Sequence, residues 1–243
     1  MITTPDAHGA GLAARPLDAL RYDGHTDDPL ECAGILHAFM PREVKVLDVG
    51  CGTGSVSLIA NRDKHNAVFG IEPDPERTAV ARSRGLDVTC GYLSSGYLAE
   101  HGPFDVVMFA DVLEHLASPA EMLALARSGM NRDGLLLISV PNAVHWIMRW
   151  QLLCGRFEYA DCGIRDSTHL RWFTRATMTQ LLNYSGFEVV EVRYSAGAGC
   201  PEYFQWRPWR WMKFTHRNRL VRLMARWFPS LFGCQLLIKA RKK

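Results

Sequence analysis

A glycine-rich turn at residues 46–54 constrains the fold of this 243-residue chain more than any other segment. It reads Val-Leu-Asp-Val-Gly-Cys-Gly-Thr-Gly, a short apolar run that leads into glycines at alternate positions. Because glycine has no Cβ, this pattern allows a strand to turn sharply into a helix and a ligand to approach the backbone closely. Asp48 stands directly before the turn, where its charge would repel a diphosphate and attract a cationic ligand. The segment therefore predicts a ligand-binding junction between a strand and a helix.

Short β-rich runs alternate with helical patterns along the chain. The expected strands are 44–49, 67–72, 87–90, 104–110, 134–140, 187–194 and 233–240. Helix starts are indicated by Asp74 before a proline, by Ser118 with Glu121 at capping-box spacing, and by Thr174 before a helix over 175–184. A further helix is expected over 29–39. This alternation predicts an α/β fold with a parallel sheet and right-handed crossovers.

A second acid supports a nucleoside ligand at the turn. Glu72 ends the next expected strand, about 20 residues further on, where an acid can accept hydrogen bonds from ribose hydroxyls. Residues 46–54 resemble motif I of class I S-adenosylmethionine-dependent methyltransferases, and Glu72 resembles their ribose-binding acid. The alternative is a structural glycine turn in an NAD-type domain. The resemblance implies a Rossmann-like, seven-stranded, mostly parallel sheet with an antiparallel last strand and a helical insertion before it.

The resemblance also implies which residues bind S-adenosylmethionine and its product, S-adenosylhomocysteine. Tyr92 and Leu93 lie in the turn after the third expected strand, at the family's adenine-contact position. The full set of expected cofactor residues is Asp48, Gly50, Cys51, Gly52, Gly54, Glu72, Pro73, Tyr92, Leu93, Asp111 and Val112.

An acid–histidine constellation follows the fourth expected strand. Asp111, Glu114 and His115 fall within one helical turn, and His169 lies further along the chain. Strands in such sheets point their carboxyl ends at the ligand crevice, and carboxylates with imidazoles can hold a divalent cation. This acid–histidine segment, followed by a later histidine, resembles the arrangement in two groups of enzymes. They are the O-methyltransferases of ubiquinone biosynthesis and the small-RNA 3′-end 2′-O-methyltransferases. In both groups four such side chains bind a divalent ion that grips adjacent substrate hydroxyls, with Glu usual at the position of Asp111.

Three roles remain open for this constellation. By resemblance, Asp111, Glu114, His115 and His169 would be ligands of a cation such as Mg²⁺. Without a metal, His115 or His169 could act as a catalytic general base, because the imidazole pKa of about 6.5 lies near neutrality. In the third interpretation, Glu114 and His115 cap the following helix and shape the pocket.

Residues 141–173 form a long, irregular segment that is expected to be the substrate loop. Its pattern, which runs from Gly155-Arg156-Phe157 to Thr168-His169-Leu170-Arg171, resembles methyltransferases found with enzymes of sugars and cell-surface polysaccharides. Arg165 and Arg171 could clamp a phosphate or carboxylate there, or pair with Asp161 and Asp166.

Charge is distributed unevenly along the chain. Residues 201–243 carry 11 Lys or Arg and one acid, whereas the residues before them have a net charge of −7. The insertion expected at 201–231 is basic and holds four of the seven tryptophans. Its apolar residues fall at helical spacing beside arginines: Leu220, Leu223, Met224 and Trp227. Such a helix could be a lid or a dimer contact, could lie on an anionic membrane, or could bind RNA.

We therefore expect a methyltransferase domain over 29–243, preceded by a leader or lid at 1–28. The expected reaction is O-methylation of a hydroxyl on a small or lipid-linked metabolite, such as a sugar, a glycolipid or a phenol. N-methylation, RNA 2′-O-methylation and cofactor binding without catalysis are the alternatives. The scattered cysteines and the lack of a signal peptide predict a cytoplasmic protein, with peripheral membrane contact through 201–231. A homodimer would also fit this insertion, and no nucleic-acid partner is expected because no RNA-binding module is recognisable.

Overall fold

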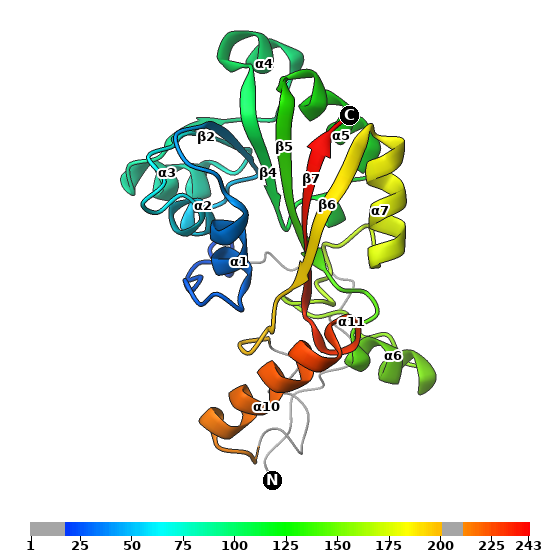
Figure 1. The fold of residues 1–243 in the computed structure, drawn as a ribbon. Helices are drawn as coiled ribbons and strands as arrows, with labels where there is room; N and C mark the ends of the chain where they lie inside the picture. The colour runs from blue at the N-terminus through cyan, green and yellow to red at the C-terminus, as the bar shows by residue number, and fades with distance from the viewer. Residues whose placement is uncertain (1–17, 201–210) are drawn as a thin grey trace.

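The computed structural model describes residues 18–200 and 211–243. A seven-stranded sheet with the order β3-β2-β1-β4-β5-β7-β6 forms its centre (Figure 1). Neighbouring strands are parallel except at β7, which runs antiparallel to β5 and β6. The expected Rossmann-like sheet with an antiparallel last strand is therefore confirmed. The strands are β1 Lys45–Val49, β2 Ala67–Glu72, β3 Asp87–Cys90, β4 Phe104–Ala110, β5 Met130–Pro141, β6 Phe187–Tyr194 and β7 Gln235–Lys242.

The expected boundaries of β2, β3, β4 and β6 agree with the structure, and those of the other strands need correction. β5 begins at Met130 rather than at 134, because Met130 already pairs with Phe104 of β4. β7 is shifted by two residues from 233–240, because Gly233 still ends the preceding helix. The first described helix starts at Cys32 rather than at 29, after a turn in which the N–H of Glu31 donates to the carbonyl of Asp28.

Helices cover both faces of the sheet. On one face, α1 (Cys32–Phe39) and α2 (Ser55–Ala60) pack against strand residues such as Val46 and Leu137. On the other face, α4 (Ser95–His101), α5 (Pro119–Ser128) and α7 (Arg175–Tyr184) bury residues such as Leu123 and Met178. α3 (Pro75–Ser83) packs against β2 and β3.

Two of the three expected helix caps are present. Asp74 Oδ1 accepts hydrogen bonds from the N–H groups of Glu76 and Arg77 and so begins α3. Thr174 forms a capping box with Thr177 at the start of α7. The capping box expected at Ser118 is wrong, because its side chain makes no cap hydrogen bond. α5 starts with a proline instead, whose fixed φ favours the first helical position.

Three helices lie beyond the carboxyl ends of the parallel strands, at the lower end of Figure 1. They are α6 (Trp146–Leu153), α10 (Phe214–Trp227) and α11 (Pro229–Phe232). A separate apolar cluster, which includes Met148 of α6 and Val221 of α10, joins two of them. The insertion before the last strand is thus helical over its described part, and its residues 201–210 lie outside the described residues.

Residues 18–31, called the strap below, cross the same edge of the sheet. Asp23 accepts hydrogen bonds from Thr53 Oγ1 at 2.8 Å and from Arg84 Nη2 at 2.7 Å. Arg77 Nε donates to the carbonyl of Ala19 at 2.7 Å. These contacts fasten the strap to the glycine turn and to α3. The lid expected at 1–28 stays a prediction, and its residues 1–17 lie outside the described part of the chain.

Gly34 lets the strap lie close against α1. A Cβ at this position would stand 2.0 Å from the backbone oxygen of Asp28. Gly34→Ala should therefore lower the free energy of unfolding by about 1–3 kcal/mol, as overpacking does. Gly96→Ala in α4 is the matched control, because the nearest atom to its Cβ would be Ser94 Oγ at 3.8 Å and alanine favours a helix. Denaturant titration measures both variants, and equal stabilities would contradict this prediction.

Candidate functional site

A cavity of about 960 Å³ lies at the carboxyl ends of β1, β2 and β4. The strap, the glycine turn, the loop at 163–169 and α10 all contribute to its walls. Its volume is typical of a ligand site. All the residues expected to bind cofactor or metal or to act in catalysis line this cavity, with the exception of Gly54.

The glycine turn has the backbone that its sequence requires. Gly50 and Gly52 adopt φ angles of 71° and 56°, in the left-handed region that favours glycine. A Cβ at Gly50 would also stand 2.7 Å from Cγ2 of Val112 across the cavity wall. Gly54 serves packing, since a Cβ there would lie 2.1 Å from Cδ1 of Leu86.

Glu72 is held at the end of β2 by two backbone amides. Its Oε2 accepts the N–H of Gly52 at 2.9 Å, and its Oε1 accepts the N–H of Asp74 at 3.0 Å. The side chain is buried and borders the cavity. The carboxylate therefore connects the glycine turn to the start of α3 and keeps further lone pairs for a ligand.

Asp48 lies at the base of the turn with a carboxylate that is only partly satisfied. Ser57 Oγ donates to Oδ2, while Oδ1 has no hydrogen-bond partner in the described residues. Burial, together with the nearby charge of Glu72, raises the pKa of Asp48 to about 7. A cation placed at Oδ1 would favour the ionised form.

The other residues expected to bind the cofactor line the same cavity as Asp48 and Glu72. Cys51 and Leu93 are buried in the cavity wall, whereas Tyr92 is 80% exposed at its rim. Pro73 and Val112 also line the cavity. These five residues offer apolar contacts to a ligand in the cavity.

Glu114, His115 and His169 form a compact cluster on another wall of the cavity. One potential ligand atom from each lies within 4.8 Å of the others. Backbone hydrogen bonds align the two segments, because the carbonyl of Glu114 accepts the N–H groups of Leu170 and Arg171 at 2.8 and 2.9 Å. Glu114 is buried, and neither of its carboxylate oxygens has a hydrogen-bond partner in another described residue. Burial and the charge of Asp111 raise its pKa well above the usual range.

Both histidines of this cluster are oriented through Nδ1. His115 Nδ1 lies 3.2 Å from the carbonyl oxygen of Thr168, and His169 Nδ1 lies 3.1 Å from that of Ile164. Because a carbonyl only accepts, we assign the proton to Nδ1 in each ring, which leaves Nε2 as the acceptor. Burial lowers the pKa of both rings, that of His169 to about 4. Both are therefore neutral at physiological pH.

Asp111 stands apart from the cluster, unlike the expected set of four ligands. Its φ of 54° turns the chain before the short 3-10 helix Leu113–His115 begins. Ser139 Oγ donates to its Oδ1 at 3.0 Å, and Gln235 Nε2 donates to its Oδ2 at 2.6 Å. Both carboxylate oxygens thus accept hydrogen bonds from residues of β5 and β7, although Asp111 still borders the cavity.

Sequence reasoning missed the part of the site that the strap supplies. Tyr22 OH donates to Asp166 at 2.5 Å, and Arg21 Nη2 donates to the same carboxylate at 3.1 Å. His25 Nδ1 lies 2.7 Å from Ser55 Oγ, and the ring borders the cavity. These residues show neither helical nor strand periodicity. In the sequence, a site here was indicated only by the run of polar side chains around Gly24.

The two arginines of the expected substrate loop bind backbone carbonyls. Arg165 Nη1 donates to the carbonyl of Glu158 at 2.8 Å, and Arg171 Nε donates to that of Ala117 at 3.2 Å. Asp166 pairs with Arg21 rather than with either of them. Neither arginine lines the cavity. These contacts organise the loop, which also contains the helix α6.

The sheet, the glycine turn and the acid at the end of β2 together define a class I S-adenosylmethionine-dependent methyltransferase. Residues 22–192 match the family model described as a methyltransferase domain, and the chain belongs to this family. The cofactor is accordingly S-adenosylmethionine, with S-adenosylhomocysteine as its product.

Individual relatives share at most about a third of their aligned residues with this chain. A ubiquinone biosynthesis O-methyltransferase of Azorhizobium caulinodans is 30% identical over 61% of this chain and 60% of its own length. An uncharacterized protein of Mycobacterium tuberculosis is 27% identical over 79% of this chain and 66% of its own length. The chain thus spans less than two thirds of either relative.

Solved structures show the same fold. A SAM-dependent methyltransferase from Archaeoglobus fulgidus matches with a TM-score of 0.56 and 20% identity, over 87% of this chain and 95% of its own. The cyclase SpnF matches with a TM-score of 0.57 and 18% identity, over 86% of this chain and 80% of its own. A cyclase among these structures shows that the fold is also used for other chemistry.

Proposed function

We propose that this methyltransferase transfers a methyl group to a hydroxyl oxygen of a small or lipid-linked metabolite. The observation that carries the proposal is the placement of His115 and His169, which line the same cavity as Asp48 and Glu72. A hydroxyl must lose its proton as the methyl group arrives, and a positioned imidazole can accept it. The name of the Azorhizobium relative supports oxygen as the acceptor atom.

The two carboxylates of the cofactor half would bind different parts of S-adenosylmethionine. Asp48 offers its free oxygen to a cationic group, and Glu72 offers its remaining lone pairs to the ribose hydroxyls. The bare backbone of the glycine turn lets the cofactor approach both. Methyl transfer then depends chiefly on holding the acceptor oxygen in line with the methyl group, an effect worth up to roughly 7–11 kcal/mol.

The histidines would act on the acceptor half. Nδ1 of each ring is bound to a carbonyl, so Nε2 is the atom that accepts the hydroxyl proton. Thr168 Oγ1 also lies 3.2 Å from His115 Nδ1 and donates to Asp166 at 2.6 Å, which orients His115 further. The proton leaves to solvent after transfer, and the acceptor departs as the methyl ether.

The same cluster fits a divalent cation, and in that case the Nε2 atoms would bind the ion instead of accepting the hydroxyl proton. Glu114 has a buried carboxylate without a partner from another described residue, next to two imidazoles whose Nδ1 atoms face carbonyl oxygens. Glu114, His115 and His169 would hold the ion, whereas Asp111 is bound to Ser139 and Gln235. A bound cation would lower the pKa of an acceptor hydroxyl.

The histidine proposal is tested by alanine substitution at His115 and at His169. Each variant should lose roughly 10²–10⁴-fold in turnover, as expected when a general base is removed, and should bind S-adenosylmethionine normally. Methyl transfer to a panel of phenols, sugars and amines gives the rates, and calorimetry gives the binding. His65→Asn is the control, because His65 is exposed with a φ of 58° that asparagine tolerates. Methylation of amines alone, or unchanged rates in both variants, would refute oxygen chemistry assisted by these residues.

The cation proposal has its own measurement. Mn²⁺ titration followed by electron paramagnetic resonance should show one bound ion, and Glu114→Gln should weaken this binding at least about tenfold. Asp111→Asn should change it much less, since Asp111 lies outside the cluster. Equal effects of both substitutions, or the absence of Mn²⁺ binding, would rule out this site.

A further inference from the structure

Exposed apolar side chains are concentrated at the lower end of the molecule. Of the eighteen exposed large apolar or aromatic residues in the described chain, eleven come from 150–159 and 211–228. We call this surface the basal face; it consists of Trp150, Leu152, Leu153, Phe157, Tyr159, Trp211, Phe214, Leu220, Leu223, Trp227 and Phe228. A concentration of exposed apolar side chains in two neighbouring segments often marks an interaction site.

The helix α10 contributes to this face in an unusual way. It buries Arg217, Val221 and Ala225 against the protein, while its apolar stripe points outward. Leu223 and Trp227 of that stripe are 51% and 71% exposed. Their spacing of four residues places them on one side of the helix.

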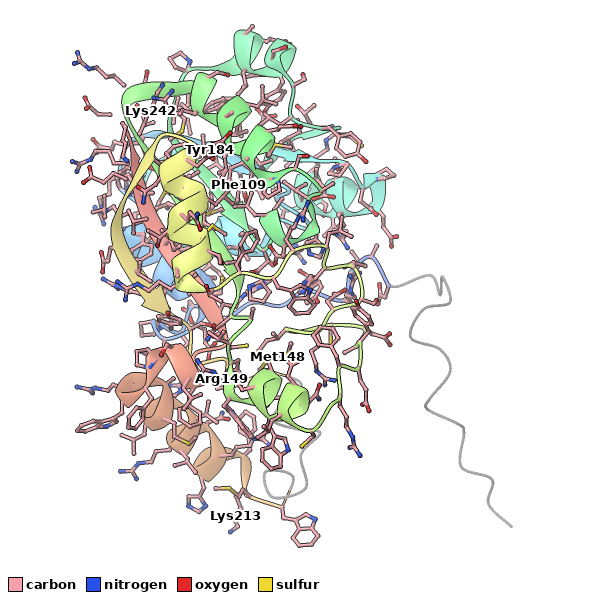
Figure 2. All side chains as sticks on the ribbon, turned by 90° about the vertical axis from the view of Figure 1, so that its right-hand side faces the viewer. Phe109, Met148, Arg149, Tyr184, Lys213 and Lys242 are labelled. Atoms are coloured by element: carbon pink, nitrogen blue, oxygen red, sulfur yellow. The ribbon has the colours of Figure 1, made fainter. Side chains whose placement is uncertain are left out.

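Positive charge flanks the apolar stripe. Arg219 and Arg226 are exposed next to it, and residues 211–228 hold five Lys or Arg and no acid. The adjoining helix α6 adds exposed Arg149 beside Trp150. α6 and α10 share one apolar cluster through Met148 and Val221, so the two helices are neighbours. Figure 2 shows α6, with Arg149, and the segment at Lys213 together at the bottom of the molecule.

We propose that the basal face docks on the surface of an anionic lipid bilayer. Leucine and tryptophan side chains enter the boundary between headgroups and acyl chains, and arginines beside them pair with anionic headgroups. No helix in the described ranges is long and apolar enough to cross a membrane. Docking through a helix that lies in the interface needs no such span.

Charge and side-chain type favour this occupant over two others. A second copy placed face to face would bring exposed Lys213, Arg219 and Arg226 of one copy near those of the other, and like charges repel. RNA would pair with the arginines and could stack on the aromatic side chains, but it would leave leucines such as Leu153 and Leu223 without an apolar partner. A bilayer satisfies the apolar and the basic side chains together.

The basal face is also close to the site. Phe214, Asn218 and Arg222 of α10 line the cavity, and Arg222 forms an ion pair with Asp28 of the strap. The helix therefore lies between the cavity and the proposed membrane surface, and Phe214 borders both. This inference concerns where the protein docks and holds for any acceptor.

Co-sedimentation with vesicles tests the proposal. The full chain should bind vesicles that contain phosphatidylglycerol at least about tenfold more tightly than vesicles of phosphatidylcholine alone, and high salt should weaken binding. Leu223→Ser with Trp227→Ser should lose binding to both compositions. Arg219→Glu with Arg226→Glu should lose the preference for anionic lipid. Cofactor binding by each variant confirms that it is folded.

Tyr184→Ser is the matched control, because Tyr184 is 84% exposed on α7, far from the basal face in Figure 2. It should bind vesicles as the unmodified chain does. The proposal is overturned if vesicles are not bound, if Tyr184→Ser weakens binding as much as the double variants, or if both compositions bind equally. If the protein does not bind vesicles but forms a dimer in sedimentation velocity, and Trp227→Ser dissociates that dimer, the basal face would be assigned to contact with a second copy instead.

Discussion

Replacement of Glu72 by alanine should raise the dissociation constant of S-adenosylhomocysteine at least about a hundredfold. The carboxylate accepts the N–H groups of Gly52 and Asp74 and borders the cavity where the ribose hydroxyls would lie. Two hydrogen bonds to a charged group contribute about 1.5–3 kcal/mol each, and each 1.4 kcal/mol is a factor of ten in affinity. Isothermal titration calorimetry measures the change directly.

Two further variants make this result specific. Glu72→Gln keeps the shape of the side chain and one acceptor oxygen, so its affinity should fall between those of the native protein and Glu72→Ala. Glu76→Ala removes an exposed acid from the first turn of α3 and should leave affinity unchanged. Native affinity in Glu72→Ala would exclude Glu72 as the ribose-binding acid.

Replacement of Asp48 by asparagine should stabilise the ligand-free protein at pH 8 and weaken S-adenosylmethionine binding. Burial raises the pKa of Asp48 to about 7, about 3 units above that of an unfolded aspartate. Keeping it ionised in the fold therefore costs at most roughly 4 kcal/mol. Asparagine has the same shape without that cost, but it cannot pair with the cationic groups of the cofactor. We expect a gain of about 2 kcal/mol or more in unfolding free energy.

The gain in unfolding free energy from Asp48→Asn should increase as the pH rises. Between about pH 4 and pH 7 the folded state holds a proton on Asp48 that the unfolded state has released, so the native protein loses stability as pH rises through this window. Above pH 7 the loss is complete. The advantage of Asp48→Asn should thus be largest at pH 8 and small near pH 4. Melting curves of both proteins across this range measure it, and an advantage that is constant with pH would refute the assignment to Asp48.

Much of the fold could be predicted because the signals were local. β2 ends at Glu72 and β4 at Ala110, as expected from apolar runs that stop at polar residues. Asp74 and Thr174 begin their helices because each side chain needs only amides two or three residues away. The error at β5 has a tertiary origin, since its start depends on the pairing of Met130 with Phe104 of β4.

Site residues that lie in one contiguous segment could be predicted from the sequence. Contacts between segments that are distant in the sequence could be predicted less well. The glycine turn with Asp48 is contiguous in sequence, and the cavity borders both. The position of Asp111 depends on Ser139 and Gln235, which come from two other strands. The strap carries no periodic signal, so its contact with Asp166, 144 residues away from Tyr22, required the structure. Spacing also revealed the apolar stripe on α10, but not that it faces outward.

The strap connects the two halves of the cavity through an unbroken series of contacts. Asp23 accepts a hydrogen bond from Thr53 in the glycine turn. The neighbouring Tyr22 donates to Asp166, which also binds Thr168, and Thr168 contacts His115. A ligand that orders one end of this series reduces the conformational entropy that remains to be lost at the other. The first ligand to bind should consequently favour the second, and the affinities of cofactor and acceptor should be positively and reciprocally linked.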